Sequence, residues 1–445
     1  MKTKMNPIDV YAFLDKAPLE SFHFKILLLC SSVYGLTGMN VMLISALANS
    51  VAAEWNLSVI DMGYLLSIGY LGMFVGALTF GGLSDIIGRK KVLVIVVTLE
   101  TIFTALCGSS PNLPAFYVIR FTAGLGLGGA LPLPGVYISE YISARYRGLF
   151  LGLVETSWVY GSILSLLIPY FILPIFGWRI TFYVALFSLP LIPLILFFLP
   201  ESIRYLIRKG KFKEAQDILA KLKAVDVIDK LNFEETELGF KKTSIKGLLS
   251  DKYFKRTVML FILWGALVYT YHGIFLWLPT IYAKQFSLKD VTSIWWTLIV
   301  TLFQIPGYYS ASFLLDRVGR KKVLIIYLSA AGISSAFLSL IVSLDWILLW
   351  SAIIAFFNLG AWAGLYTYTQ ELYPTEARGT GSGAAASFGR LVGISAPSFT
   401  AYLFITSGIF GPFAAFSVIH LFAAFSVIVL GIETRMKPLE KISGF

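Results

Sequence analysis

Charged residues are scarce in this sequence, and their scarcity excludes an ordinary soluble domain. Only 14% of the 445 residues are Asp, Glu, Lys or Arg, whereas 57% are hydrophobic. Soluble globular domains carry about a quarter charged residues. The chain has too few charges to cover a water-exposed surface, so its composition favours a protein of the lipid bilayer.

Cysteine is nearly absent, which excludes a disulfide framework and a thiolate metal site. The two cysteines, Cys30 and Cys107, fall inside long apolar runs, and no residue cluster has the spacing of metal ligands. No motif pairs a nucleophile with a base, so the sequence does not predict an enzyme. We therefore expect a protein without metal or cofactor that acts by binding rather than by catalysis.

Long apolar runs are what the sequence has in abundance. Each is long enough to cross a hydrocarbon layer about 30 Å thick as a helix. Helices are expected because lipid cannot satisfy the backbone groups of an open strand edge. The sequence therefore predicts an all-α membrane protein with twelve transmembrane helices. Their approximate ranges are 24–48, 61–83, 92–110, 114–138, 148–173, 179–199, 256–282, 290–315, 323–343, 346–370, 380–404 and 410–431.

The basic residues are concentrated on alternate loops. The formal net charge of +11 is by itself compatible with nucleic-acid binding. With the N-terminus placed in the cytoplasm, however, 31 of the 36 Lys and Arg fall in the two tails and the cytoplasmic loops. Three lie on the other side (Arg179, Lys284 and Lys289) and two lie within spans (Arg120 and Arg390). Cytoplasmic loops of membrane proteins are enriched in this way. We expect a cell-membrane protein with both termini in the cytoplasm and the lipid bilayer, not nucleic acid, as partner.

One charged pattern occurs twice, 231 residues apart. The stretch "GGLSDIIGRKKV" returns later as "FLLDRVGRKKV". Two parallel halves with a solute between them are a common plan of secondary transporters. We expect an N-terminal six-helix half at 1–200 with a cytoplasmic tail at 1–23, linker helices at 201–255, and a C-terminal six-helix half at 256–445 with its own short tail. Nothing in the sequence requires an oligomer, so a monomer is expected.

These patterns resemble the major facilitator superfamily over nearly the whole chain. "GGLSDIIGRKK" is similar to its signature between the second and third helices, and "RFTAGLGLGG", "PESIRYL" and "EARGTG" are similar to further signatures of its sugar, organic-ion and aromatic-acid branches. "LDKAPLESFHFKILLL" and "GRLVGISAP" resemble the aromatic-acid and organic-ion branches more than the sugar porters. The resemblance implies the major facilitator fold and transport of a small organic solute by alternating access.

The resemblance also implies two cytoplasmic gate clusters, which lock the outward-facing state and break when the halves move. Gly88 would supply a tight turn, and Asp85 could accept hydrogen bonds from a helix N-terminus or an arginine. The lysine pair that follows each turn is expected to anchor the topology only. The gate residues are Asp85, Arg89, Glu140, Arg147, Glu201 and Arg204 in the first half, and Asp316, Arg320, Glu371 and Arg378, with Glu433 and Arg435, in the second.

Four ionisable side chains inside the predicted spans are functional candidates, because burying them in a membrane is costly. Arg390 matches an arginine of the aromatic-acid and organic-anion branches, and its permanent charge suits a bidentate grip on a substrate carboxylate. Glu155 is the expected proton carrier, since burial favours a neutral carboxyl. Arg120 matches the arginine of the fourth-span signature and is assigned to coupling or gating. Glu100 is expected to be structural.

The first span departs from the pattern of proton-coupled relatives. They carry acids where this chain has Asn40 and Thr37. Asparagine cannot carry a proton, so coupling must use Glu155 or be absent. Aromatic side chains in spans 7 and 10 suit a ring-bearing substrate. The expected substrate-binding residues are Asn40, Glu155, Tyr271, His272, Gln304, Tyr366 and Arg390.

Three functions are compatible with these observations. The leading hypothesis is proton-coupled symport of an organic anion, an aromatic or other carboxylate. A facilitator of a neutral solute such as a sugar is the alternative that Asn40 favours, although the paired glutamines of the sugar porters' seventh span are absent. A sensor or binding protein that does not translocate is a third possibility, because synaptic-vesicle glycoproteins resemble the same pattern. Intact gate motifs in both halves argue against it.

Overall fold

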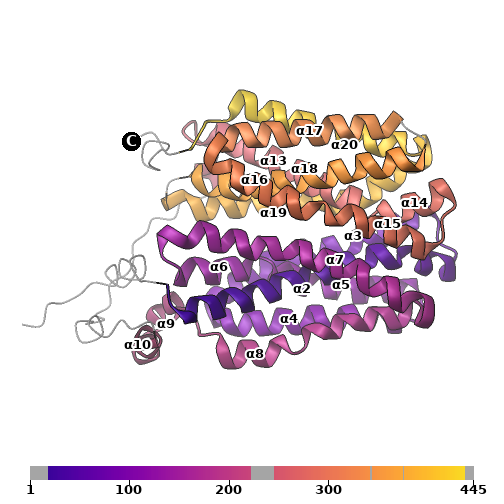
Figure 1. Ribbon diagram of the computed structural model, residues 1–445. Helices are drawn as coiled ribbons and strands as arrows, with labels where there is room; N and C mark the ends of the chain where they lie inside the picture. Colours follow the sequence, from indigo (N-terminus) through magenta and orange to yellow (C-terminus); the bar gives the residue numbers. More distant parts are fainter. Residues whose placement is uncertain (1–18, 222–244, 341–342, 374, 436–445) are drawn as a thin grey trace, which may run out of the picture.

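Long helices running side by side make up the protein (Figure 1). The computed structural model describes residues 19–221, 245–340, 343–373 and 375–435. The helices of the first part are α2 Ser21–Trp55, α3 Val59–Ile87, α4 Arg89–Leu106, α5 Leu113–Ala130, α6 Pro132–Tyr141, α7 Ala144–Phe182, α8 Leu191–Phe198, α9 Ile203–Arg208 and α10 Phe212–Lys221, with short 3-10 helices η1 Cys107–Ser109 and η2 Tyr183–Ser188. Those of the second part are α12 Ile245–Leu248, α13 Phe254–Phe275, α14 Leu278–Phe286, α15 Asp290–Leu302, α16 Gln304–Val318, α17 Arg320–Leu340, α18 Leu344–Glu371, α19 Thr375–Ser407 and α20 Phe410–Leu430.

The number of membrane crossings agrees with the sequence prediction. Among the described residues, 11 helical stretches are long and apolar enough to cross a membrane, and one of them, Arg145–Phe198, has 54 residues. A helix of that length would measure about 81 Å, more than twice a hydrocarbon core of about 30 Å. Gly177 interrupts it with φ 75° and ψ 173°, so this stretch crosses twice. The fold is therefore all-α with twelve crossings, as predicted.

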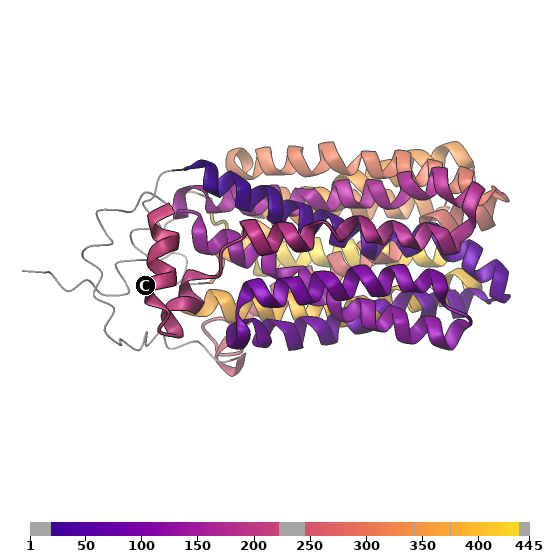
Figure 2. The same ribbon diagram turned by 90° about the horizontal axis from the view of Figure 1, so that it is seen from below.

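The helices fall into two groups in chain order. In Figure 1, α2 to α8 (indigo to magenta) lie below α13 to α20 (orange to yellow), and α9 and α10 lie at the left end. Figure 2 shows the same elongated bundle from below, with α9 and α10 again beyond its end. Between the groups, α3 packs against α19 and α7 packs against α15. The division into two halves and a linker, with the bounds given above, stays a prediction.

Close packing of α3 on α5 positions the polar residues of the first group. Gly72 and Gly76 of α3 lie directly against the backbone of Phe121 and Leu125 on α5. A side chain at either glycine would collide with that backbone, so the two helices could not approach as closely. Small residues allow such close contact where no hydrophobic force drives helices together in lipid. The contact brings α5 and its Arg120 deep into the first group.

Candidate functional site

A cluster of polar side chains joins the two helix groups near the middle of the bundle. The Tyr34 hydroxyl of α2 donates to Oε2 of Glu155 on α7, and it lies 3.2 Å from the hydroxyl of Tyr366 on α18. Tyr308 of α16 donates to the Gly152 carbonyl, one turn before Glu155, at 3.3 Å. Glu155 and Tyr366 are half-buried, whereas Tyr34 is buried. The cluster therefore places an acid between tyrosines from both groups.

Arg390 faces this cluster from α19. It lies within electrostatic range of Tyr366, Tyr34 and Glu155, and it forms no ion pair with any acid in the described part of the chain. Its side chain is half-buried. An arginine fork that no protein carboxylate occupies can accept an anionic group from outside. Arg390 and Glu155 together give the site a positive and an acidic pole.

Aromatic rings surround the two poles. Tyr366 packs edge-on against Trp264 of α13, with ring centroids 5.3 Å apart, and beside Trp362 at 5.6 Å. On the opposite group, the Trp158 ring lies 6.1 Å from that of Tyr34. Edge-to-face aromatic packing at such spacings is favourable. The planar ring of a bound substrate could make the same edge-to-face contacts with these side chains.

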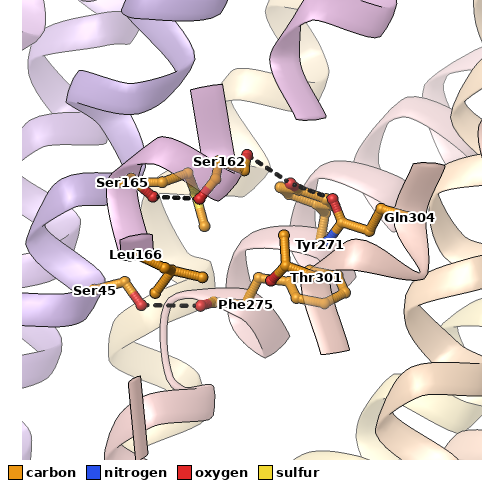
Figure 3. Close-up of a pocket in the computed structure, with 9 residues that line it drawn as sticks. Ser45, Ser162, Ser165, Leu166, Tyr271, Phe275, Thr301 and Gln304 are labelled. Atoms are coloured by element: carbon orange, nitrogen blue, oxygen red, sulfur yellow. Dashed lines mark hydrogen bonds between the residues drawn. The ribbon is translucent and has the colours of Figure 1, made fainter. Parts of the chain in front are cut away.

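A small cavity lies further along the bundle, between α2, α7, α13, α15 and α16 (Figure 3). Tyr271 stands at its centre: its hydroxyl accepts from Nε1 of Trp158 at 2.8 Å and donates to Oε1 of Gln304 at 3.3 Å. Gln304 is the first residue of α16, at the joint between two helix segments. The structure thus brings Tyr271 and Gln304 together on one cavity. Met42, Ser45, Ser162, Ser165, Leu166, Phe275 and Thr301 complete its lining.

Asn40 and His272 do not line this cavity. The Asn40 side chain is fully buried and its Nδ2 lies 3.4 Å from the Ser188 hydroxyl. His272 is buried too, with Nδ1 held 2.8 Å from the Val268 carbonyl of its own helix. Its ring packs against Tyr70 of α3 at 4.7 Å between centroids. His272 therefore contributes to the contact between the two groups.

Arg120 joins α5 to α2 by its guanidinium. Nη1 and Nη2 lie 3.3 Å from the Asn40 carbonyl, and Nη2 lies 3.1 Å from the Val41 carbonyl. The side chain is 4% exposed. Carbonyl dipoles at mid-helix stabilise the buried cation only in part, because they carry no net charge. Arg120 thus lies next to Asn40, the α2 position at which proton-coupled relatives are expected to carry an acid.

The first gate cluster is built around the turn between α3 and α4. Glu201 accepts from the backbone N–H of Arg89 at 2.8 Å and so caps the N-terminus of α4. The Arg89 guanidinium pairs with Glu140 and lies 3.7 Å from Asp85. Gly88 has φ 106° and ψ 147°, a conformation that is essentially confined to glycine. The cap of α4 is thus Glu201, and Asp85 is its more exposed neighbour.

The second gate cluster repeats this geometry in the other group. Glu433 accepts from the backbone N–H of Arg320 at 2.9 Å. Arg320 pairs with Glu371 at 3.0 Å and with Asp316 at 3.0 Å. Gly319 has φ 109° and ψ 153°. The internal sequence repeat therefore corresponds to a repeated three-dimensional site.

The remaining predicted gate arginines lie around these clusters. Arg147 donates to the Ile142 carbonyl at 3.5 Å, and Arg204 on α9 lies within electrostatic range of Arg89. Arg378 is half-buried near the start of α19. The sequence did not single out Arg208, whose guanidinium donates to the Asp85 carbonyl.

The lysines after each turn do more than was expected. Nζ of Lys90 donates to the Leu196 carbonyl at 2.6 Å, and Nζ of Lys321 donates to the Gly431 carbonyl at 2.8 Å. Leu196 lies in the last turn of α8, and Gly431 directly follows α20. A cation at a helix C-terminus stabilises the orphan carbonyls there. The first lysine of each pair therefore also caps a helix.

The end of the bundle opposite α9 and α10 is closed by contacts between the groups. The Ser45 hydroxyl of α2 lies 3.0 Å from the carbonyls of Phe275 and Leu276 at the end of α13. Asn49 and Ser50, one turn further on, donate to the Asp290 carboxylate of α15 at 3.2 and 3.1 Å. The ion pairs that Arg89 and Arg320 make in the gate clusters, in contrast, stay within one group each. These contacts fit a state that is closed at the α14–α15 end.

Comparison with known proteins gives matches over nearly the whole chain. Residues 27–444 match the family described as "Sugar (and other) transporter". The "Niacin transporter NiaP" of Acinetobacter baylyi is 35% identical over 98% of this chain and 100% of its own length. The "4-hydroxybenzoate transporter PcaK" of the same organism is 29% identical over 87% of this chain and 86% of its own.

The fold also matches a solved structure. The xylose transporter XylE from E. coli, in a partially occluded inward open conformation, superimposes with a TM-score of 0.79 at 20% identity. The match covers 94% of this chain and all of that one. At this identity the likeness supports the architecture alone.

Proposed function

This chain belongs to the sugar (and other) transporter family, and we propose that it carries a monocyclic aromatic carboxylate across the cell membrane in symport with protons. The family places it within the major facilitator superfamily, as the sequence motifs indicated. It is an integral membrane transporter and not an enzyme. Two ionisable side chains that lie near each other, Arg390 and Glu155, support the choice of substrate and of coupling ion.

Arg390 is the observation that carries the substrate proposal. The residue is half-buried, lies within electrostatic range of Tyr34 and Glu155 of one group and Tyr366 of the other, and forms no ion pair with a described acid. A buried cation without a partner penalises a neutral occupant, because the charge then stays uncompensated. A carboxylate removes that penalty and can accept two parallel hydrogen bonds from the fork. The site therefore favours an organic anion.

The rings near Arg390 narrow the anion to an aromatic one. Trp264 and Trp362 contact Tyr366, and Trp158 reaches the site from the other group. Relatives of this chain are named as transporters of niacin and of 4-hydroxybenzoate, each a carboxylic acid on a six-membered aromatic ring. Their names support the same class of substrate here.

Glu155 is the proposed proton carrier. The Tyr34 hydrogen bond holds its carboxyl in the gap between the groups, where motion of the halves changes its surroundings. When the carboxyl is shielded from water, burial favours its neutral form. When the other state exposes it to water, the charged form is favoured. Arg120 is proposed to assist by holding α2 and α5 together during this exchange.

Movement of the halves would expose the site to each side in turn. The gate clusters around Arg89 and Arg320 are proposed to stabilise one state more than the other. The basic loops support a cytoplasmic position for both termini by the rule for membrane orientation, and α9 and α10 would lie on that side. We propose that the protein works as a monomer, because each chain contains both halves.

A facilitator of a neutral solute is the second candidate, and Asn40 is the observation that favours it. Asn40 is buried, holds no proton and lies beside Arg120. In that case transport would run down the solute gradient and ignore pH. A binding protein that does not translocate would bind its ligand yet show no flux in either direction.

Calorimetric titration of purified protein tests the substrate proposal with a matched pair. Nicotinate and nicotinamide have the same ring and differ in the charge of one group. We expect nicotinate to bind and nicotinamide to bind at least tenfold more weakly, with xylose as a non-aromatic control. Equal affinity for nicotinate and nicotinamide would contradict a role for Arg390 in charge recognition and would favour the neutral-solute alternative.

A further inference from the structure

A second buried carboxyl, Glu100, lies outside the substrate cluster. It belongs to α4, and its side chain is completely buried. The Thr37 hydroxyl of α2 donates to Oε1 at 2.9 Å. Oε2 finds no donor among the described residues. The Thr37 hydroxyl and the nearby Asn40 amide are a poor substitute for the hydration that an ionised carboxylate loses on burial.

The neighbouring helices supply no charge to compensate this carboxyl. From α2, Thr37 and the side chain of Asn40 lie beside it. From α5, the backbone of Gly126 contacts the backbone of Glu100. In the described part of the chain, no lysine, arginine or histidine forms an ion pair with it. A proton on the carboxyl would remove the charge and spare the cost of burying it.

Arg120 is the charged residue on the far side of Asn40 from Glu100. It donates to the carbonyls of Asn40 and Val41, so Asn40 stands between the cation and Glu100. On its other side, Arg120 packs along Gly69 of α3, and the following residue, Tyr70, lies within its electrostatic range. Ser188 of η2 closes the remaining side of Asn40. The order of contacts is therefore Tyr70, Arg120, Asn40, Glu100.

Tyr70 separates this chain of contacts from the space between the helix groups. Its ring is 5% exposed and packs edge-on against His272 of α13, across the boundary between the groups. Ser67, one turn earlier on α3, lies 2.7 Å from Ser398 of α19. Opening the bundle at the α14–α15 end would separate α3 from α13 and α19. That movement would uncover Tyr70 and admit water toward Arg120 and Asn40.

We propose that Glu100 is a second proton-binding site, held as a neutral carboxylic acid in this conformation and opened to exchange when Tyr70 parts from His272. Helix α2 has Thr37 and Asn40 where proton-coupled relatives are expected to carry acids. Glu100 of the neighbouring helix α4 supplies a carboxyl beside these two residues. The proposed protonation of Glu100 is inferred only from its burial and its contacts in the structure. Its place in the transport cycle rests on the proposed proton symport.

Infrared spectroscopy tests the protonation without any substrate. At neutral pH, the difference between wild type and Glu100→Gln should contain the C=O stretch of a protonated carboxylic acid. The matched control is Glu54→Gln, because Glu54 is 42% exposed and paired with Arg179 at 2.6 Å; its difference spectrum should contain carboxylate bands only. A Glu100 difference spectrum with carboxylate bands and no protonated carboxyl would overturn the proposal.

A second variant keeps the test valid if Glu100→Gln does not fold. Thr37→Val preserves the shape of the side chain and removes the donor to Oε1. The protonated-carboxyl band should then shift, because its hydrogen bonding has changed, whereas an unshifted band would contradict the assignment to Glu100.

Transport assays test the role in the cycle. In proteoliposomes, Glu100→Gln should bind nicotinate like wild type and respond less to an acid-outside pH gradient. An unchanged gradient response would overturn the role in coupling. Failure of the wild type to transport any carboxylate would instead contradict the proposed function and leave the infrared result standing.

Discussion

At the scale of single residues, the proposed specificity depends on Arg390. Its guanidinium lies within electrostatic range of Tyr366, Tyr34 and Glu155, which come from both helix groups. A lysine would keep the charge but lose the planar fork that matches a carboxylate. The shape of the cation should therefore matter as well as its sign.

We expect Arg390→Ala to weaken nicotinate binding by about 10- to 100-fold, since a hydrogen bond to a charged group contributes about 1.5–3 kcal/mol. Arg390→Lys should recover part of the loss. Calorimetry on both variants would measure this, with nicotinamide as the ligand control. If a variant loses as much affinity for nicotinamide as for nicotinate, Arg390 supports the structure and does not recognise the charge of the ligand.

Glu155→Gln should separate coupling from exchange. The amide oxygen can still accept from Tyr34, so the site keeps its shape, but the side chain no longer takes up a proton. Accumulation against a gradient should disappear, while counterflow exchange of labelled substrate across liposomes should continue. The exposed Glu54→Gln is the matched control and should accumulate substrate normally. Accumulation by Glu155→Gln at the wild-type level would exclude Glu155 as the carrier.

The residues of the polar cluster around Glu155 that the sequence missed are neutral ones. Arg390 and Glu155 were predictable because charges inside spans are rare. Tyr34 and Tyr308 are two of 23 tyrosines in a chain that is 16% aromatic, so nothing in the sequence separates them from packing residues. Glu100 was visible as an acid inside a span, but only the structure shows that Thr37 donates to its Oε1 and that no described group donates to Oε2 in hydrogen-bonding geometry.

At the scale of elements, the two tight turns fix how each gate begins. Gly88 combines a positive φ with contact to the Glu201 carboxylate that caps α4. We expect Gly88→Ala to destabilise the protein by about 1–3 kcal/mol, the cost of a non-glycine residue in this region of φ and ψ. A lower unfolding temperature in detergent would report it. Gly82→Ala is the control, because Gly82 on α3 has open space beside it; equal stability of the two variants would contradict the strain argument.

Asp85 tests whether the first gate regulates motion. It is 45% exposed and 3.7 Å from Arg89, so it contributes little to stability in this state. Asp85→Asn should fold normally, bind nicotinate with nearly the wild-type affinity and transport it more slowly. Titration and uptake on one preparation would measure both quantities. Uptake at the wild-type rate would remove the gate role from Asp85.

Element boundaries were the least predictable part of the fold. Hydropathy located twelve crossings, because apolar length alone decides what spans a bilayer. It did not locate the joint at Phe303, where α15 ends and α16 begins. That joint places Gln304 beside Tyr271. Such breaks depend on packing against neighbouring helices, which the apolar composition of a span does not encode.

At the scale of the whole molecule, the sequence segment that occurs twice forms the same gate cluster in both helix groups. The 231-residue repeat pairs Gly88 with Gly319 and Arg89 with Arg320, and their backbone angles and capping carboxylates agree in the structure. The halves differ where they meet, with Glu155 on one side and Arg390 on the other. Function, in this account, arises from that asymmetry between two similar halves.

Uptake of labelled nicotinate by wild-type proteoliposomes, with and without an acid-outside pH gradient, tests the central claim most directly. The account predicts accumulation above the external concentration when the gradient is present. It predicts only equilibration when a protonophore removes the gradient. Empty liposomes correct for passive entry of the neutral acid. Uptake that equilibrates equally with and without the gradient would contradict proton symport and would show that Asn40 marks a facilitator.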